Sequence, residues 1–190
     1  MDAAVGAGID AVELLVAGDN VVPDLLAEVS TLGHAPRVIG IYRRADLPTG
    51  VRDVVLALWR VSDPGNVGTL VRTADAFGAG VALSPECADP TSPRALRASA
   101  GAIFRVPLVA WDELPEQRVA LVAHGGTPLA DVPLEPPLAL LLGSEREGLP
   151  ERLVARCHKA TIELPGDAES LNVAAAGAIA LYEVGRRVGA

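Results

Sequence analysis

Short, continuous apolar runs alternate with segments of helical periodicity along most of this 190-residue chain. The runs are bounded by Gly, Pro or Asp, and their unbroken apolar character is typical of parallel strands buried on both faces of a sheet. We predict strands at residues 11–17, 38–42, 54–59, 80–83, 118–123, 138–142 and 160–164. We predict helices at residues 22–31, 67–77, 93–98, 150–157 and 171–188. This order predicts an α/β fold with a mostly parallel sheet and helices on both of its faces.

The segment 43–50 is polar and closes with Pro and Gly, which predicts a boundary there. The fifty residues before it offer only two strands and about two helices, too few for an independent core of ordinary size. We therefore expect residues 1–50 to form an appended subdomain and residues 51–190 to form the main domain.

The net charge of −8 argues against a nucleic-acid partner when it is taken alone. The charge is unevenly distributed, because residues 60–110 carry five Arg and only four acidic residues. Since the local field depends on where charges lie, a basic region on an acidic protein can still bind RNA. The secondary candidates for phosphate contact are Arg94, Arg97 and Arg105, each of which could equally be a solvated surface residue.

Neither a membrane protein nor a metalloprotein is indicated. The longest nearly uninterrupted apolar stretch, 173–182, is half of the roughly 20 residues that a spanning helix needs. The start of the chain lacks the basic region of a signal peptide. Cys87 and Cys157 are far apart, and the three His residues fall in no metal-binding spacing. We expect a reduced, cytoplasmic protein without a metal.

The segment 66–78 follows the strand predicted at 54–59. Asn66 suits the N-cap of a helix, and Gly78 suits the position just after its end. The apolar stripe of this helix is Val67, Leu70, Val71, Ala74 and Phe77. Arg72 falls off that stripe, on the face with Gly68 and Asp75. It is either a solvated residue on an ordinary crossover helix or a phosphate-binding residue close to the helix start.

Two further loops follow predicted strands at their carboxyl ends, where ligands bind in α/β folds. The loop 143–150 contains three charged residues and could also be a simple polar turn. The loop 165–172 leads into the final helix, for which Ser170 is a candidate cap. That helix is apolar all round between Val173 and Tyr182, which indicates burial either in the core of one chain or at a subunit interface.

Together these segments resemble the motifs of the SpoU (TrmH-like) family of RNA 2′-O-ribose methyltransferases, in the SPOUT superfamily. The matching segments are 66–78 (NVGTLVRTADAFG), 142–149 (LGSEREGL) and 164–173 (LPGDAESLNV), with 97–107 (RASAGAIFRVP) between the first two. Three motifs in series are specific where one alone would be weak. By the same resemblance, residues 1–50 look like a shortened version of the substrate-binding domain that many members carry, and residues 51–190 look like the methyltransferase domain.

The resemblance implies a parallel sheet whose C-terminal segment forms a deep trefoil knot (the SPOUT fold). It implies S-adenosyl-L-methionine as methyl donor and a ribose 2′-hydroxyl of structured RNA as acceptor, in rRNA or tRNA, of which rRNA is favoured. It also implies a homodimer built on the first-motif helix and the final helix. The cofactor-binding residues that it implies are Ala123, His124, Gly125, Leu142, Gly143, Leu164, Leu171 and Val173.

Arg72 matches the family's catalytic arginine. The other polar motif positions are Asn66, Glu145, Ser170 and Asn172, which would orient Arg72 and the RNA backbone. Arg72 could accept the proton of the 2′-hydroxyl, or it could clamp a phosphate and stabilise the developing alkoxide. A guanidinium keeps its proton at neutral pH, which favours the clamp. The alternative function is a non-catalytic RNA-binding or assembly protein that keeps this fold, which the acidic charge favours.

Overall fold

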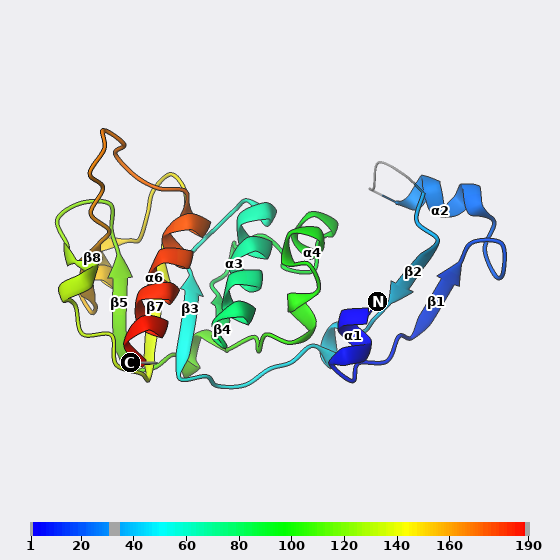
Figure 1. Cartoon of the computed structure of the whole chain (residues 1–190), viewed down its shortest axis with the longest axis horizontal. Helices are drawn as coiled ribbons and strands as arrows, with labels where there is room; N and C mark the ends of the chain where they lie inside the picture. Colours follow the sequence, from blue (N-terminus) through cyan, green and yellow to red (C-terminus); the bar gives the residue numbers. More distant parts are fainter. Residues whose placement is uncertain (1, 31–34, 189–190) are drawn as a thin grey trace. The chain divides into compact units, whose positions relative to one another are not determined.

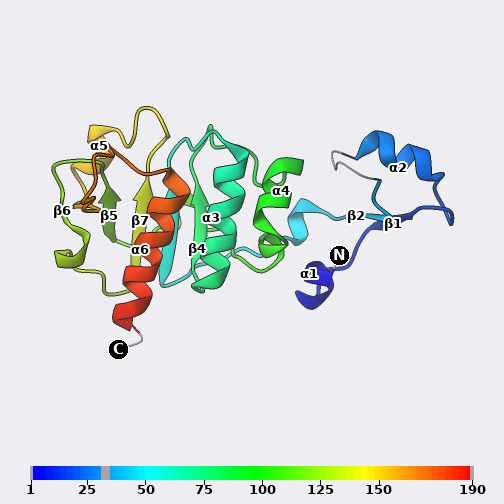
Figure 2. The same ribbon diagram turned by 45° about the horizontal axis from the view of Figure 1, so that its top comes forward.

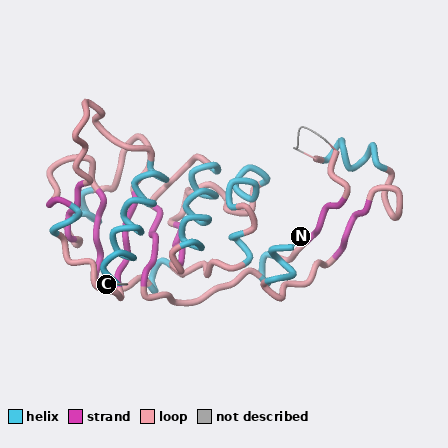
Figure 3. The backbone as a smooth tube through the Cα atoms, in the orientation of Figure 1, coloured by secondary structure: helices cyan, strands magenta, loops and turns pink. Residues whose placement is uncertain are grey.

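The structure is a computed structural model that describes residues 2–30 and 35–188. The chain divides into two compact units, Met1–Leu47 and Pro48–Ala190. Figure 1 colours the chain from its N-terminus to its C-terminus, and Figure 3 shows the same path by secondary structure.

The described part of the first unit has a two-stranded antiparallel sheet and short helices. Its elements are α1 (Asp2–Gly6), β1 (Glu13–Val16), α2 (Pro23–Val29), β2 (Val38–Ile41) and the 3₁₀ helix η1 (Arg44–Asp46). Asn20 closes the turn after β1, because its side chain accepts a hydrogen bond from Val16 N (2.7 Å) and donates one to Leu14 O (2.8 Å). Both predicted strands are present, whereas α1 was not predicted. The predicted end of α2 at Thr31 lies outside the described residues.

The second unit is built on a six-stranded parallel sheet, which confirms the predicted α/β fold. Its strand order is β4-β3-β7-β5-β8-β6. The strands are β3 (Val54–Leu58), β4 (Gly80–Leu83), β5 (Gln117–Leu121), β6 (Thr127–Pro128), β7 (Leu138–Leu142) and β8 (His158–Thr161). All neighbouring pairs run parallel. Every residue of β7 is buried, as its unbroken apolar sequence LALLL predicts for a central strand.

Helices and 3₁₀ turns connect these strands. They are α3 (Pro64–Ala76), α4 (Pro93–Ser99), α5 (Glu151–Val154), α6 (Val173–Val188), η2 (Ala102–Phe104), η3 (Trp111–Glu113) and η4 (Leu129–Asp131). In both ribbon views α3 and α6 lie side by side against one face of the sheet (Figures 1 and 2). The described residues include no helix that is both long and apolar enough to cross a membrane.

The two faces of the sheet are covered differently. On one face α6 approaches α3 and β7 so closely that a Cβ at Gly177 would lie 2.4 Å from Leu70 Cδ2. On the other face Trp111, Leu149 and Cys157 pack against buried strand residues. The first face therefore carries the long helices, and the second is covered by η3 and by segments that flank α5.

The start of α3 corrects one sequence expectation. The N-cap is Asp63, whose Oδ1 accepts a hydrogen bond from Asn66 N at 3.0 Å. The helix therefore begins at Pro64, three residues before the predicted start at Val67, and Pro64 in the first turn was the signal for this. Asn66 instead lies inside the helix, so its side chain is available for contacts with other segments. At the other end of α3 Phe77, expected in the buried stripe, is 41% exposed.

Two other expectations about helices were wrong. Gly68 was expected beside Arg72 on the solvent side, but a Cβ there would lie 2.3 Å from Ala95 O, so Gly68 allows α4 to pack against α3. Ser170 was the candidate cap of α6, but the Oδ1 atom of Asn172 accepts the hydrogen bond from Ala174 N at 2.9 Å. Both Ser and Asn are good caps, and the sequence alone did not separate them.

Candidate functional site

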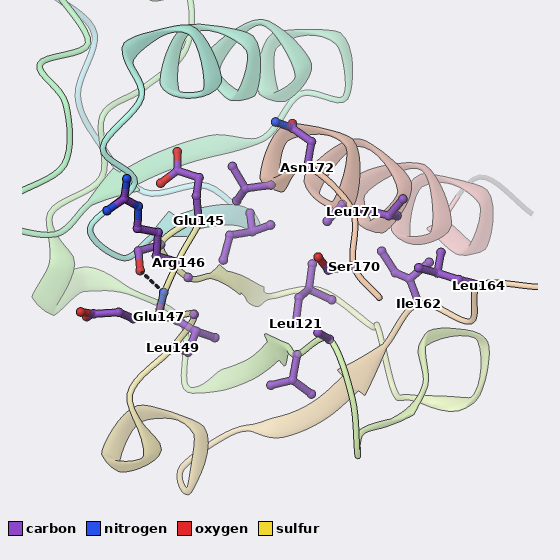
Figure 4. A pocket seen from close by; sticks show the side chains of 18 residues that line it. Leu121, Glu145, Arg146, Glu147, Leu149, Ile162, Leu164, Ser170, Leu171 and Asn172 are labelled. Carbon is purple, nitrogen blue, oxygen red and sulfur yellow. Dashed lines mark hydrogen bonds between the residues drawn. The ribbon is translucent and has the colours of Figure 1, made fainter. Parts of the chain in front are cut away.

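A pocket of about 660 Å³ lies where three loops meet at the carboxyl ends of parallel strands. The loops follow β5, β7 and β8, and the pocket is lined by residues from 121–123, 142–149 and 162–173 together with Ala176. Figure 4 shows this pocket with its lining side chains. Its size and its place in the sheet are those of a small-molecule site in an α/β protein.

The loop 143–149 is closed on itself by hydrogen bonds. Ser144 N donates to Gly148 O (3.2 Å), Gly148 N donates to Ser144 O (3.0 Å), and Glu147 N donates to Ser144 Oγ (3.2 Å). The last of these is the dashed line in Figure 4. A Cβ at Gly143 would lie 2.1 Å from the carbonyl carbon of Gly148, and Gly148 itself has a φ of +67°. The loop shape therefore requires glycine at position 143 and favours it at position 148.

Three side chains that are far apart in the sequence form a polar chain beside the pocket. Asn66 Nδ2 donates to Glu145 Oε1 at 2.9 Å, and Asn172 Nδ2 donates to Asn66 Oδ1 at 3.0 Å. In Figure 4 Glu145 and Asn172 both point toward the start of α3. We call this Glu145–Asn66–Asn172 set the polar relay. It connects the loop after β7, the first turn of α3 and the residue immediately before α6.

Glu145 also receives backbone donors from the segment that precedes α3. Its Oε2 accepts from Ser62 N at 3.2 Å, and its Oε1 accepts from Asp63 N at 3.3 Å. Partial burial works to raise the pKa of this carboxyl, but the hydrogen bonds from Asn66 and from these backbone groups outweigh it and lower the pKa. Glu145 is therefore an anion held in one orientation at neutral pH.

The loop 164–171 contrasts with the loop 143–149. Within the described chain, none of its backbone N–H or C=O groups bonds to another backbone group. Ser170, whose hydroxyl makes no hydrogen bond to a described residue, lines the pocket with Leu164 and Leu171. Backbone groups without partners beside apolar side chains suit a ligand that has both a flat apolar part and several polar atoms.

Residues 53–182, which contain the pocket and the polar relay, match the SpoU rRNA Methylase family. This match covers more than half of the chain. The protein belongs to the SpoU rRNA methylase family. The family resemblance predicted from the three motifs is thereby confirmed.

Two curated relatives illustrate the similarity to other SpoU proteins. The 23S rRNA (guanosine(2553)-2′-O)-methyltransferase RlmP of Bacillus subtilis is 36% identical over 141 residues, which are 68% of this chain and 57% of the relative. The 23S rRNA (uridine(2479)-2′-O)-methyltransferase of Streptomyces viridochromogenes is 31% identical over 191 residues, which are 87% of this chain and 66% of the relative. The chain thus spans little more than half to two thirds of the length of these relatives.

Solved SpoU structures have the same fold. The SpoU methyltransferase AviRb from Streptomyces viridochromogenes, in complex with the cofactor AdoMet, superposes with a TM-score of 0.85 at 27% identity over 100% of this chain and 87% of that chain. An AdoMet-bound rRNA methyltransferase from Sinorhizobium meliloti gives a TM-score of 0.85 at 28% identity over 99% of this chain and 85% of that chain.

The structure brings most of the predicted SpoU site residues together. Those that line the pocket are Ala123, Leu142, Gly143, Glu145, Leu164, Ser170, Leu171, Asn172 and Val173. Asn66 does not line the pocket but joins it through the polar relay. His124 and Gly125 follow Ala123 directly and lie outside the lining. The described residues contain no group of His, Cys, Asp or Glu side chains that could hold a metal ion.

Several residues that line the pocket were not predicted. They are Leu121, Val122, Ser144, Arg146, Glu147, Gly148, Leu149, Ile162 and Ala176. Most of them lie inside or next to the motifs. They could have been found because they neighbour predicted site residues in the same loops. Ala176 lies one helical turn after Asn172, so its signal was the helical spacing.

Arg72 lies on the exposed side of α3, outside the lining of the pocket of its own chain. Its guanidinium forms no hydrogen bond or ion pair with the described residues. In contrast, Arg94 pairs with Asp63 at 2.9 Å and Arg105 pairs with Asp75 at 2.5 Å. Of these arginines, Arg72 therefore has all its hydrogen-bond donors available for a ligand.

Proposed function

We propose that this protein transfers a methyl group from S-adenosyl-L-methionine to a ribose 2′-hydroxyl of structured RNA, in rRNA rather than tRNA. The observation that carries the proposal is the polar relay, because it joins residues of all three SpoU motifs at the rim of one pocket. The names of the relatives, two of them 23S rRNA 2′-O-methyltransferases, support the choice of rRNA. The assembled relay does not favour a non-catalytic RNA-binding or assembly protein.

The pocket fits S-adenosyl-L-methionine. Leu121, Leu149 and Ile162 offer apolar contacts for a flat base, and the loop 164–171 offers backbone groups for polar atoms. Two neighbouring structures are of AdoMet-bound proteins. When bound, the cofactor supplies an activated methyl group on a sulfonium. The residues of this chain then have to hold the ribose in line and exclude competing groups, which is a task of positioning.

In this proposal Arg72 binds the RNA backbone and stabilises negative charge that develops on the 2′-oxygen. A guanidinium keeps its proton at neutral pH, so this role suits Arg72 better than proton abstraction. The polar relay fixes the first turn of α3 against the loop 143–149 and so fixes the helix that carries Arg72. Arg94 and Arg105, each already paired with a carboxylate of α3 or its cap, contribute less to RNA binding.

We further propose a homodimer in which α3 and α6 of two protomers pair and each site is completed by the partner chain. Two observations support this. Arg72 does not line the pocket of its own chain, and Ile179 and Tyr182 of α6 are 40% and 59% exposed although they are large and apolar. Ile179→Arg should give a monomer with less than about a tenth of the activity, because a two-fold interface carries each substitution twice. Light scattering and a methylation assay test this, and an active monomeric wild type would refute it.

The same proposal includes a trefoil knot in the fold, a role for each of the two parts of the chain, and a cytoplasmic location of the protein. The trefoil knot is supported by the pocket, which residues of 162–173 line together with the loop 143–149, and by the packing of α6 on β7. Residues 1–50 act as a shortened substrate-binding-like segment that precedes the methyltransferase domain of residues 51–190 in the sequence, which the separate compactness of Met1–Leu47 supports. We place the reaction in the cytoplasm.

The decisive test is transfer of labelled methyl groups from S-adenosyl-L-methionine to rRNA, to tRNA and to an RNA with a 2′-deoxy target. We expect rRNA to be labelled. The RNA whose target nucleotide lacks the 2′-hydroxyl should not be labelled at that nucleotide. Arg72→Ala should reduce transfer by about 10²-fold or more while cofactor binding is retained, since one preorganised charge contributes on that order. Arg156→Ala, a change at another exposed arginine, is the control. Cofactor binding without methyl transfer to any RNA would support the non-catalytic alternative.

A further inference from the structure

Trp59 contacts both ends of the loop 143–149. Its backbone N–H donates a hydrogen bond to the backbone oxygen of Leu142, the last residue before the loop, at 2.8 Å. The centre of its indole ring lies 5.7 Å from the guanidinium carbon of Arg152, on α5 directly after the loop. The residue just after β3 therefore binds the start of the loop that carries Glu145 through its backbone, and its indole ring contacts the segment that follows the loop.

The indole ring of Trp59 is itself fixed by a second aromatic ring. The ring centroids of Trp59 and Trp111 are 5.7 Å apart, and the rings are inclined by 54°. This is a favourable geometry for an aromatic pair. Trp111 in turn packs against the buried cluster on the sheet face opposite α3. The two tryptophans of the chain thus pack against each other, and neither of them lines the pocket.

The next residue keeps the end of β3 from moving. Arg60 has a φ of +53°, its backbone N–H donates to Ser84 Oγ at 2.9 Å, and its guanidinium is paired with Glu86. The pKa of Arg60 is raised first by the hydrogen bond to Glu86, with a smaller contribution from the charge of Glu147 in the loop. The end of β3 is therefore fixed toward β4 as well as toward β7.

We propose that Trp59 is a positioning residue that sets the cofactor affinity of the pocket by holding the loop 143–149 in its closed shape. The identity of the cofactor rests on the proposed function, whereas the closed shape of the loop does not. Trp59 is not among the residues that line the pocket, so its effect on a ligand passes through the loop. Its loss should weaken cofactor binding and raise the KM for the cofactor, while kcat at saturating cofactor is retained.

Binding of S-adenosyl-L-methionine, measured by calorimetry, separates this role from general destabilisation. We expect Trp59→Leu to weaken binding roughly ten-fold and Arg152→Gln roughly three-fold, from the strengths of aromatic-pair and cation–π contacts. Trp59→Phe keeps a ring under Arg152 and should recover affinity to within about three-fold of wild type. Arg156→Gln removes a charge from the same segment, without a ring contact, and should leave affinity unchanged.

Hydrogen exchange tests the loop directly. Without ligand, exchange of the Ser144 and Gly148 amides should be faster in Trp59→Leu and Arg152→Gln than in wild type or Arg156→Gln. Unchanged affinity and exchange in Trp59→Leu would overturn the positioning role. A wild type that binds no cofactor would overturn the proposed function, and hydrogen exchange would then decide by itself whether Trp59 holds the loop.

Discussion

The loops 143–149 and 164–171 line the same pocket but are built in opposite ways. The first is closed by three hydrogen bonds, has no space for a Cβ at Gly143, and has at Gly148 a positive φ that favours glycine. The second makes no backbone–backbone hydrogen bond within the described chain. The first loop therefore has its shape before any ligand arrives, and the second gains partners for its polar groups when a ligand binds. Substitutions in the first should change stability and function, and substitutions in the second should change function alone.

Gly143→Ala should have the largest effect. Its Cβ would lie 2.1 Å from the carbonyl carbon of Gly148, and backbone atoms cannot move aside as a flexible side chain can. We expect a loss of at least about 2 kcal/mol in the free energy of unfolding, with a fall in Tm of roughly 5 °C or more. Cofactor binding should be lost as well, because the loop must open. Thermal unfolding and calorimetry check this, and a stable variant with normal binding would show that the loop is not rigid.

Asn66→Asp should have the next largest effect, because it places a second carboxylate at the 2.9 Å contact with Glu145. In wild type the pKa of Glu145 is lowered, so the stabilisation from the polar relay is present above the unfolded-state value, about 4.3, and is lost as pH falls through the lower folded value. Two adjacent carboxylates instead raise the pKa of one of them.

The rate of methyl transfer by the wild type should accordingly not fall through protonation of Glu145 between about pH 5.5 and 8. Asn66→Asp should lose on the order of 10²-fold in methyl transfer at pH 7.5 and recover part of it as pH is lowered. Asn66→Ala, which removes the relay without adding a charge, should show the loss but no recovery. Equal pH profiles for the two variants would contradict the assigned role of the charge.

Ser170→Ala tests the second loop. The hydroxyl lines the pocket and makes no hydrogen bond to a described residue, so its removal leaves no protein group without a partner. We expect Tm to change by less than about 1 °C, since surface substitutions away from contacts change stability by at most about 0.5 kcal/mol. Methyl transfer should fall about ten-fold, as for the loss of one hydrogen bond to the reacting partners. A large fall in Tm would mean that Ser170 has a structural role.

The contrast between the loops also marks what the sequence could predict. Continuous apolar runs such as LALLL predicted the buried strands, and the resemblance of the motifs to the SpoU family predicted that Glu145, Ser170 and Asn172 belong to one site. The caps were mistaken because neighbouring residues could each form them, as with Ser170 and Asn172. The positions of Gly68 and Trp59 depend on packing between segments that are distant in sequence, and no local pattern contains this information.

Gly166→Ala should have the smallest effect and is the matched counterpart of Gly143→Ala. A Cβ at Gly166 would meet no heavy atom within 4 Å, and its φ lies outside the left-handed range that favours glycine. Alanine restricts the unfolded chain more than glycine does, so we expect a gain of up to about 0.5 kcal/mol and cofactor affinity within about two-fold of wild type. Both variants add one methyl group to a loop of the same pocket. Comparable losses of Tm in the two would show that 164–171 is packed as tightly as 143–149, and the distinction between a preformed and a ligand-ordered loop would fail.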